Sequence, residues 1–581
     1  MKKAKLYFMQ EELVQSPGRT AMRNFFKRRL SIVGMCVFLF IFVACFSLSF
    51  ILPIDEANTD STRKSLPPSM NYLNIPKELV NNVRDISFGS TFGAGIDRNG
   101  KLYQWGTMTD TSAKVANIPA NLPPLKMITC GMDHVAAVAE DGTVYAWGND
   151  RLKITDIASS IKGKNVVDIQ AGFQSTVALD DTGKLHFWGN ASMFSFKPEY
   201  DDQGTFTAFA INITTAIALK NDKTVVCLSS ADTYFKNIPE SIQGHVTGVA
   251  STDAVCAAIL EDHTVAVWGS TLAPAYKIPE HIQGHVVDLK GGRAHFTALL
   301  DDGSVQSWGD NTFGQTNEPR IEGYNKIDVN FYQSAAVDAN GHAVAWGQKG
   351  YLMGTDGFGR DVFTRLIYGG RITLTVGFIA VIISTVIGVI IGGLSGYFGG
   401  KTDMFLMRFA EVVGSIPQIP LLMILAAIIQ TRVSQTGRII FVMVLLGVLT
   451  WPSLARLTRA QILAEKENEF VTAAKAMGIR ERVIIFRHII PNVMPVILVN
   501  VTLSLATCLL IESSLSFLGF GVTEPTPTWG NMLNACVSST VIKKYPWQWI
   551  FPSLALGLTT ISINIIGDGL RDAIDPKSNE R

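Results

Sequence analysis

The sequence of 581 residues has few side chains arranged for covalent chemistry. Its seven cysteines have neither CxxC nor metal-ligand spacing, so they predict no disulfide framework and no zinc site. Residues 350–581 contain no recognisable Ser-His-Asp, Cys-His or paired-carboxylate pattern. We therefore expect no catalytic residue, no metal site and no cofactor on this chain.

An amphipathic stretch near residue 470 has the pattern of a docking element. Its apolar and small residues recur at helical spacing with polar residues between them, and they are Phe470, Val471, Ala473, Ala474 and Met477. Gly478 follows, and a glycine commonly ends a helix. A second short helix is expected before Pro491. Such an element can dock into a groove on a soluble partner, or it can lie on a membrane surface.

Three further residues interrupt or border apolar runs. Glu512 lies beside a long apolar run, where an ionisable side chain indicates a solute pathway. The alternative is a position at the outer interface, because the 20 residues from Asn492 to Ile511 already suffice to cross a membrane. Pro417 and Pro420 would break or kink the apolar helix that contains them. That segment could line a pore or pack against a partner subunit.

The composition places these residues in a membrane protein. Charged residues make up 17% of the chain, against about 25% in ordinary soluble domains. Hydrophobic residues are 47%, and the mean hydropathy is +0.23. Six uncharged stretches are long enough to cross roughly 30 Å of hydrocarbon. They are Leu30–Ile54, Ile372–Gly400, Val412–Thr431, Ile439–Ala455, His488–Ile511 and Tyr545–Gly567, and the fourth is short at 17 residues.

The distribution of charge predicts how these spans are oriented. Lys and Arg cluster in the leader, residues 1–29, and in the connection of residues 456–491, so both should be cytoplasmic. Six spans place the C-terminus there too, with its Arg571, Lys577 and Arg581. Residues 81–350 carry 20 Lys+Arg and 29 Asp+Glu, a net charge of −9. We expect this acidic region to lie outside the cytoplasm, between the first two spans.

An internal repeat fills the acidic region. The dipeptide Trp-Gly recurs about every 40 residues, with one interval of 80, at Trp105, Trp147, Trp188, Trp268, Trp308 and Trp346. With Cys227 in the missing place, seven units run from about residue 74 to residue 347. Each unit has an apolar strand, a tight turn such as Asp141-Gly142, and an alternating strand that ends at Trp-Gly. Seven such units predict a β-propeller.

The repeat also bears on the histidines, which could suggest a metal site: His245, His281, His285 and His295. His245 and His285 occupy equivalent repeat positions, so we favour the repeat as the explanation. The segment Gly292–Gly309 resembles the regulator-of-chromosome-condensation repeat, whose family forms seven-bladed propellers. The fourth unit departs from it, because Asn221-Asp-Lys and Cys227 replace the turn glycine and the tryptophan.

The stretch from Glu469 to Pro491 resembles the coupling motif of ATP-binding-cassette importer permeases. That motif has Glu-Ala-Ala, three residues, Gly, nine residues and Ile-x-Leu-Pro. Thr472, His488 and Ile490 here replace its Glu, Ile and Leu. Other segments resemble the oligopeptide/dipeptide branch of the family: Gly354–Arg371, Arg487–Asn492, Glu512–Gly521, Pro525–Asn531 and Gly567–Pro576. The resemblance covers roughly residues 10–55 and 350–581 and is strongest to the second of the two permease subunits.

This resemblance implies roles and partners. Residues at the motif positions would transmit the motion of an ATPase to the spans, and they are Glu469, Phe470, Ala473, Ala474, Gly478 and Pro491. The implied partners are a second permease, two ATP-binding-cassette ATPases that hold the ATP and Mg²⁺, and an extracytoplasmic substrate-binding protein. Membrane lipid surrounds the spans. Nucleic acid is an improbable ligand, because no basic patch accompanies the propeller.

The sequence thus predicts an α-helical membrane protein with six transmembrane helices and an extracytoplasmic all-β seven-bladed propeller inserted between helices 1 and 2. Its expected parts are a leader (1–29), a first helix (30–54), the propeller (74–349) and a permease core (350–581). We expect a non-enzymatic subunit of an importer of oligopeptides, dipeptides or similar small solutes in a bacterial or archaeal cytoplasmic membrane. The propeller would be an accessory binding domain whose ligand is unknown. The alternative is a membrane-anchored binding or adhesion module whose permease remnant does not transport.

Overall fold

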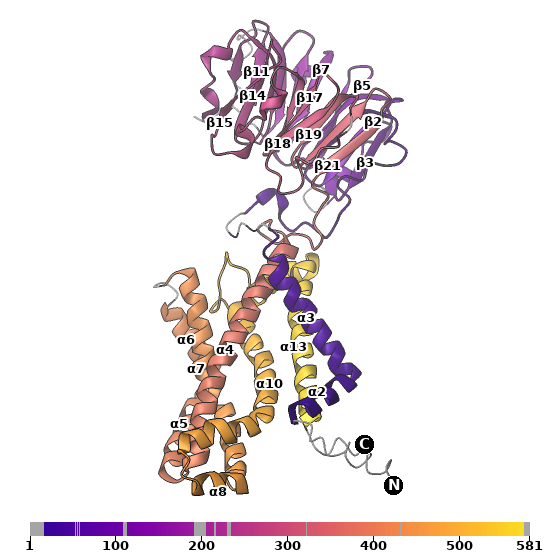
Figure 1. The fold of residues 1–581 in the computed structure, drawn as a ribbon. Helices are drawn as coiled ribbons and strands as arrows, with labels where there is room; N and C mark the ends of the chain where they lie inside the picture. The colour runs from indigo at the N-terminus through magenta and orange to yellow at the C-terminus, as the bar shows by residue number, and fades with distance from the viewer. Residues whose placement is uncertain are drawn as a thin grey trace, which may run out of the picture. The chain divides into compact units, whose positions relative to one another are not determined.

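The computed structural model describes residues 17–574 apart from 53, 55, 57, 58, 109–112, 191–204, 214, 215, 229–233, 321 and 430–432. Lys577, Arg581 and the first sixteen residues of the predicted leader therefore lie outside the described residues. The chain forms two compact units, a helical unit (Met1–Asp60 with Thr355–Arg581) and a β unit (Ser61–Gly354). Figure 1 shows the elements of both units.

The β unit is a ring of seven three-stranded antiparallel sheets, the blades, in which strands follow one another in chain order. Short 3₁₀ turns connect several of them. The blades are β1–β3 (Val83–Phe88, Phe92–Asp97, Leu102–Gly106), β4–β6 (Leu125–Cys130, His134–Ala139, Val144–Gly148), β7–β9 (Val166–Ala171, Ser175–Asp180, Leu185–Gly189), β10–β12 (Phe206–Ile211, Ala216–Lys220, Val225–Cys227), β13–β15 (Val246–Ser251, Val255–Leu260, Val265–Gly269), β16–β18 (Val286–Gly291, His295–Leu300, Val305–Gly309) and β19–β21 (Tyr324–Asn330, Gln333–Asp338, Ala343–Gly347). The seven predicted units and the all-β propeller are confirmed.

The fourth blade forms despite its departure from the repeat. The turn position that glycine holds in five blades, such as Gly142 with a φ of +85°, is held here by Lys223 and in the fifth blade by His263, each with a φ of +63°. A non-glycine residue in this left-handed region costs about 1–2 kcal/mol. The third strand of this blade, Val225–Cys227, has three residues, whereas the corresponding strands of the other blades have five. The sequence departure thus shortens the blade edge without removing the blade.

The six repeat tryptophans are core residues of the propeller. All six are buried, at the end of the third strand of their blades. The indole N–H of Trp105 donates to Tyr72 O (3.0 Å), that of Trp268 to Phe235 O (2.9 Å) and that of Trp308 to Ala275 O (3.1 Å). Each acceptor lies 33 residues before its tryptophan. In these three blades the tryptophan therefore fixes the connecting segment of its own repeat.

The ends of the propeller meet where the ring closes, as the insertion requires. The Val83 N–H donates to Gly341 O, and the Ala343 N–H donates to Val80 O, both at 2.8 Å. Outside the blades, Ser69 pairs with Tyr351 in an antiparallel bridge. The two connecting segments of the β unit therefore run side by side.

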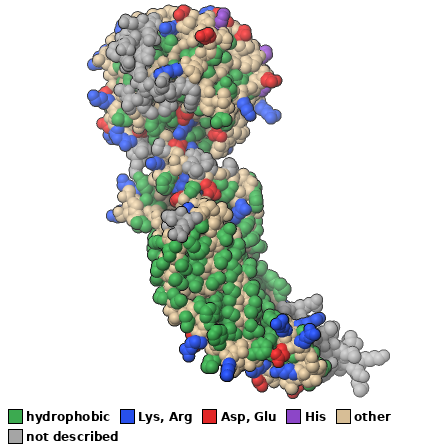
Figure 2. Space-filling view, turned by 90° about the vertical axis from the view of Figure 1, so that its left-hand side faces the viewer, with side chains coloured by type: hydrophobic (Ala, Val, Ile, Leu, Met, Phe, Trp, Pro, Cys, Tyr) green, Lys and Arg blue, Asp and Glu red, His purple; other side chains and the backbone are tan. Residues whose placement is uncertain are grey.

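The helical unit has long apolar helices. Its elements are α2 (Pro17–Lys27), α3 (Arg29–Leu48), α4 (Val362–Phe398), α5 (Gly400–Ser415), α6 (Gln418–Ile429), α7 (Gln435–Glu465), α8 (Glu469–Ala476), α9 (Glu481–Val483), a π-helical turn (Ile484–Ile489), α10 (Ile490–Phe517), α11 (Trp529–Leu533), a 3₁₀ turn (Asn534–Val537), α12 (Ser539–Lys544) and α13 (Trp547–Ile574). Among the described residues, α3, α4, α7, α13 and the continuous helix Glu481–Phe517 are long and apolar enough to cross a membrane. Figure 2 shows a broad hydrophobic surface over this unit.

The predicted third span is not one helix. Residues Val412–Thr431 are divided between α5 and α6, which meet at an angle of 75°, and Thr431 lies outside the described residues. Pro417 separates the two helices, and Pro420 lies in the first turn of α6, where its missing N–H has no helical acceptor. The break that the two prolines predict is confirmed, and the straight span is corrected to a bent pair.

Other spans differ from prediction in length. α3 ends at Leu48 rather than Ile54, and α4 begins at Val362 rather than Ile372, capped by the Asp361 carboxylate, which accepts from the Thr364 N–H (2.9 Å). α7 has 31 residues where 17 were predicted. Its C-terminal part carries Arg459, whose guanidinium donates to Asp403 of α5 (2.6 Å). Charged residues end an apolar stretch in the sequence, but a paired arginine does not end the helix.

α4 and α7 form the closest helix pair of this unit. Small residues on α4 permit it: a Cβ added at Gly392 would overlap Ala455 O, and one added at Gly396 would lie 2.8 Å from Arg459 O. Gly388 faces Leu454 in the same way. Spacing small residues by four lets two membrane helices bring their backbones close together.

Candidate functional site

The predicted docking helix is α8, and its end is fixed by backbone geometry. After Ala476 the Ile479 N–H donates to Ala474 O (3.2 Å) and the Gly478 N–H to Lys475 O (3.0 Å). This pair of bonds is the Schellman motif, which needs a left-handed residue at the position after the C-cap. Gly478 has that conformation, with a φ of +74°. The glycine of the motif therefore stops the helix, as the sequence predicts.

α8 has one buried and one exposed face. Val471 and Ala474 are buried and pack in a cluster with Ile484, Ile485 and Ile489 of the π-helical turn. The ammonium of Lys475 lies 5.1 Å from the centre of the Tyr397 ring at the end of α4. The buried face thus attaches α8 to elements that continue directly into α4, α7 and α10.

The other residues of α8 are exposed in the described chain. Phe470 is 38% exposed and Met477 is 72% exposed, and Glu469 and Ala473 are exposed too. Large apolar side chains on one short helix, flanked by a carboxylate, suit non-covalent docking to another protein. Of the predicted coupling residues, Ala474 alone is buried, in the cluster that holds α8 against the π-helical turn.

The segment after Gly478 differs from prediction. The expected second short helix, α9, continues without interruption through the π-helical turn into α10, so the fifth span begins at Glu481 rather than His488. Pro491 lies in the first turn of α10 and is exposed. Because Pro491 has no N–H to donate, the preceding backbone is free to form the wider π turn. Pro491 therefore lies on the same rigid helix that carries the buried contacts of α8.

Glu512 lies in α10 and is fully buried. Its carboxylate accepts from the hydroxyls of Ser516 (2.8 Å) and Ser513 (3.2 Å), and Thr373 and Thr528 also face it. The hydroxyls satisfy the carboxylate within this chain. Both alternatives for Glu512, a pathway role and a position at the outer interface of the membrane, stay predictions.

Pro417 and Pro420 are exposed at the junction of α5 and α6. The amide of Gln418 donates to Leu449 O of α7 (3.2 Å), which fixes the start of α6 to its neighbour. The prolines face away from this chain's own packing, so both original alternatives, a pore lining and a partner contact, stay predictions. The structure does not bring Glu512, the prolines and α8 together in one site.

A polar cluster near the start of α4 was missed by the sequence prediction. Arg365 is buried and pairs with Glu524 (2.9 Å), and Arg360 pairs with Asp356 (2.8 Å) and with Glu524 (2.5 Å). These residues line a cavity of about 710 Å³ whose other walls are α10, α11 and α12. The available signal was an arginine in the first turn of an apolar helix, which must find a partner or face water.

The histidines of the propeller do not come together. His285 contacts Asp301 (3.0 Å), His245 contacts Glu261 (3.5 Å) and His281 contacts Gln306 (3.0 Å), whereas His295 is buried against Ser334 (2.9 Å). Among the described residues, no group of three His, Cys, Asp or Glu side chains could hold a metal ion. The equivalent contacts of His245 and His285 follow the repeat.

Comparison with known families gives three matches. Residues 384–580 match the family of binding-protein-dependent transport system inner membrane components. Residues 16–68 match the N-terminal transmembrane domain of oligopeptide transport permease C. Residues 286–315 match the regulator of chromosome condensation (RCC1) repeat. Helical unit and propeller thus resemble separate families.

Individual relatives resemble the chain over about two fifths of its length. A putative peptide permease protein of Brucella suis is 44% identical over 228 residues, which cover 39% of this chain and 74% of the relative. The oligopeptide transport system permease protein OppC of Haemophilus influenzae is 43% identical over 242 residues, 42% of this chain and 75% of the relative. The dipeptide transport system permease protein DppC of Bacillus subtilis is 40% identical over 227 residues, 39% and 69% of the two chains.

Proposed function

Because the chain belongs to the peptide permeases of binding-protein-dependent transport systems, we propose that it forms, with a second permease subunit, the pathway of an ATP-driven importer of oligopeptides, dipeptides or similar small solutes. Membership makes it a multi-pass membrane protein that is not itself an enzyme, as the sequence predicted. ATP and Mg²⁺ are held by two separate ATPases, and an extracytoplasmic protein delivers the solute.

The observation that carries the coupling mechanism is the two-faced helix α8. Its exposed face, with Phe470, Ala473 and Met477, sits in a groove of an ATPase. When the ATPases close on ATP, α8 moves with them. Val471 and Ala474 pass this motion to the π-helical turn and so to the rigid helix Glu481–Phe517. The chain contributes mechanical transmission, and no bond is made or broken on it.

The charge distribution supports one orientation. The basic connection that contains α8 faces the cytoplasm with both termini, and the acidic β unit lies outside. The propeller then serves as an accessory external binding domain. Replacing residues 74–347 by a short linker should change the affinity or the range of solutes taken up. Unchanged uptake across a panel of peptides would contradict this accessory role.

The first test is purification of the tagged chain from its native membrane in mild detergent, followed by mass spectrometry. We expect a second permease and two ATPases to accompany the chain. A chain that repeatedly comes without ATPases, under conditions that preserve a known peptide importer, would instead support the membrane-anchored binding module.

A further inference from the structure

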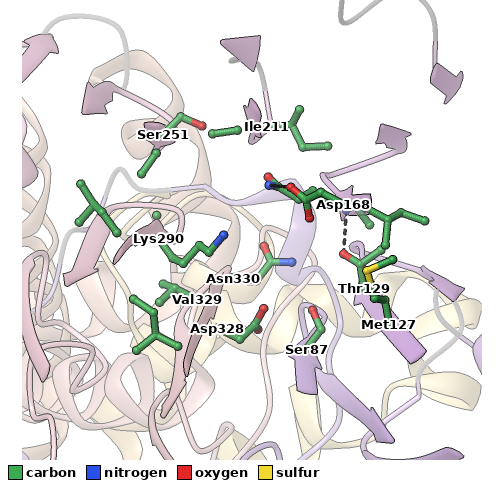
Figure 3. Close-up of a pocket in the computed structure, with 18 of the residues that line it drawn as sticks. Ser87, Met127, Thr129, Asp168, Ile211, Ser251, Lys290, Asp328, Val329 and Asn330 are labelled. Atoms are coloured by element: carbon green, nitrogen blue, oxygen red, sulfur yellow. Dashed lines mark hydrogen bonds between the residues drawn. The ribbon is translucent and has the colours of Figure 1, made fainter. Parts of the chain in front are cut away.

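The first strands of the seven blades enclose a cavity at the centre of the propeller. The cavity holds about 170 Å³, and its lining residues come from β1, β4, β7, β10, β13, β16 and β19. Figure 3 shows Lys290, Asn330 and Asp168 extending toward one another into this space, with Asp328 and Ser87 on one side of it. The volume suits a ligand the size of an amino acid or of the end of a short peptide.

The cavity is closed at one end. The Asn330 amide donates across the ring to Cys130 O (2.6 Å), and the Asn212 amide donates to Ser251 O (3.1 Å) and Gly292 O (2.8 Å). Beyond them, the loops that follow the first strands contribute an apolar cluster that includes Met132 and Phe331. In the described part of the chain, these contacts seal the side on which the first strands end.

The other end continues into a wider space. A second cavity of about 610 Å³ shares Asp168, Gln170 and Lys290 with the first and extends past Asp288 and His263. A chain longer than the inner cavity can therefore extend outward into the second one.

The inner cavity contains polar groups that are left without partners. The carboxylate oxygen Oδ2 of Asp328 and the hydroxyl of Ser251, a residue only 2% exposed, are buried without a hydrogen bond. Lys290 forms no ion pair within 4 Å among the described residues. Buried polar groups are normally satisfied, so unpaired ones lining a cavity point to a bound molecule.

The other two carboxylates of the cavity already accept hydrogen bonds. Asp85 pairs with Lys326 and also accepts from the Ile128 N–H (2.7 Å), and Asp168 accepts from the amide of Gln170 (3.0 Å). Burial and the nearby Asp85 raise the pKa of Asp328 to about 7, which a neighbouring cation would oppose. The polar groups of the cavity that are left for a ligand are thus one ammonium, one carboxylate and one hydroxyl.

The two walls of the cavity differ. β10 and β13 contribute Ala210, Ile211, Val249 and Ala250 to the lining, whereas the charged residues come from β1, β7, β16 and β19. A ligand with both charges on one side and an alkyl group on the other would satisfy both walls.

We propose that the central cavity of the propeller binds the zwitterionic end of an amino acid or short peptide. The ligand carboxylate pairs with the Lys290 ammonium, the ligand ammonium pairs with Asp328, and Ser251 donates to the ligand. The small side chain lies against Ala210 and Ile211. A simple anion would meet three carboxylates, and a simple cation would meet the Lys290 ammonium, so neither fits as well.

The test uses the full chain in detergent, with radiolabelled L-alanyl-L-alanine as the probe and equilibrium dialysis as the measurement. Blocked N-acetyl-L-alanyl-L-alanine amide is the competitor without charges. Lys290→Met and Asp328→Asn should each weaken binding at least tenfold. Lys277→Met, at an exposed lysine of the preceding connecting segment, should leave binding unchanged. The blocked peptide should not compete.

Tryptophan fluorescence melting will show whether Lys290→Met and Asp328→Asn each fold. If only one of them folds, its binding is still enough to test the site. The inference is overturned if the dipeptide does not bind, if both folded variants bind it like the wild type, or if the blocked peptide competes equally. Cavity occupation by water alone would give the first of these results. The inference rests on the propeller's proposed binding role, yet uptake is measured separately. A wild-type chain that takes up the dipeptide normally but does not bind it in dialysis refutes the cavity site alone, whereas a wild-type chain and a Lys277→Met control that both lack uptake refute the transport function.

Discussion

Replacing Phe470 by alanine tests whether the exposed face of α8 contacts an ATPase. A phenylalanine side chain offers roughly 200 Å² of accessible surface, and 38% of that of Phe470 is exposed in this chain. Docking would then bury about 75 Å² more, which is worth about 2 kcal/mol at about 25 cal/mol per Å². The affinity of the ATPase pair should fall roughly 25-fold.

The assay is titration of purified ATPases onto the detergent-solubilised permease pair, followed by ATP-driven uptake in vesicles. Phe40→Ala is the matched control, because Phe40 on α3 is 75% exposed and lies outside the coupling element. It removes a larger exposed area and should leave the affinity unchanged. Wild-type affinity of Phe470→Ala, or an equal loss in the control, would refute the docking face.

Three further changes test the coupling turn, the helix packing and the propeller. Gly478→Asp should stay in the membrane yet lose uptake, because its φ of +74° costs about 1–2 kcal/mol for other residues, nothing lies within 4 Å of the added Cβ, and the new anion would follow directly after the exposed Met477; normal uptake would contradict this. Gly392→Val should prevent the close approach of α4 and α7 and abolish monodisperse protein in gel filtration, whereas Gly557→Val, with nothing within 4 Å, should purify normally. Burial lowers the pKa of His295 to about 4 from an ordinary 6.5, so the unfolded chain binds one more proton and stability is lost as pH falls below 6.5. At pH 5 this loss is about 2 kcal/mol; His295→Gln, which copies Gln333 of the last blade, should remove it in fluorescence-monitored unfolding at pH 7 and pH 5, and an unchanged pH dependence would show that His295 does not cause it.

The propeller could be predicted because each repeat contains the local sequence signals that form its own strands and turns. Trp-Gly marks the end of the third strand, and the turn glycines supply the positive φ of the hairpin. Because seven copies repeat the same local signals, one weak copy does not obscure the fold. The fourth blade shows the limit, since nothing in Asn221-Asp-Lys reveals that Lys223 will take the left-handed conformation.

Helix ends in the membrane unit could not be predicted equally well. The arginines after Ala455 predicted the end of a span, but Arg459 pairs with Asp403, which lies 56 residues earlier, and only the folded structure shows this pair. The same holds for Glu512, whose hydroxyl neighbours come from α4 and from the segment before α11 as well as from its own helix. A single sequence displays charges, whereas their partners depend on contacts between distant segments.

The sequence predicted the helix of the candidate coupling site, but not which of its side chains are buried and which are exposed. Helical spacing places Val471 and Ala474, and equally Phe470 and Met477, among the apolar positions of the helix. The sequence alone therefore does not show which pair is buried. The π-helical turn decides this, because its three isoleucines cover one side of α8. The polar cavity of the propeller was missed for a similar reason, since its lining residues are spread over some 240 positions of the chain.

The helical unit and the β unit each have apolar clusters of their own. The two largest apolar clusters of the helical unit contain residues of that unit alone, and the propeller closes its ring through its own strands and through the pair Ser69 and Tyr351. Removing residues 74–347 therefore takes no residue from these two apolar clusters. A permease without its propeller should keep its ATPases and its coupling. Any change in uptake that follows the deletion then reports how the solute is captured, and not how ATP drives the spans.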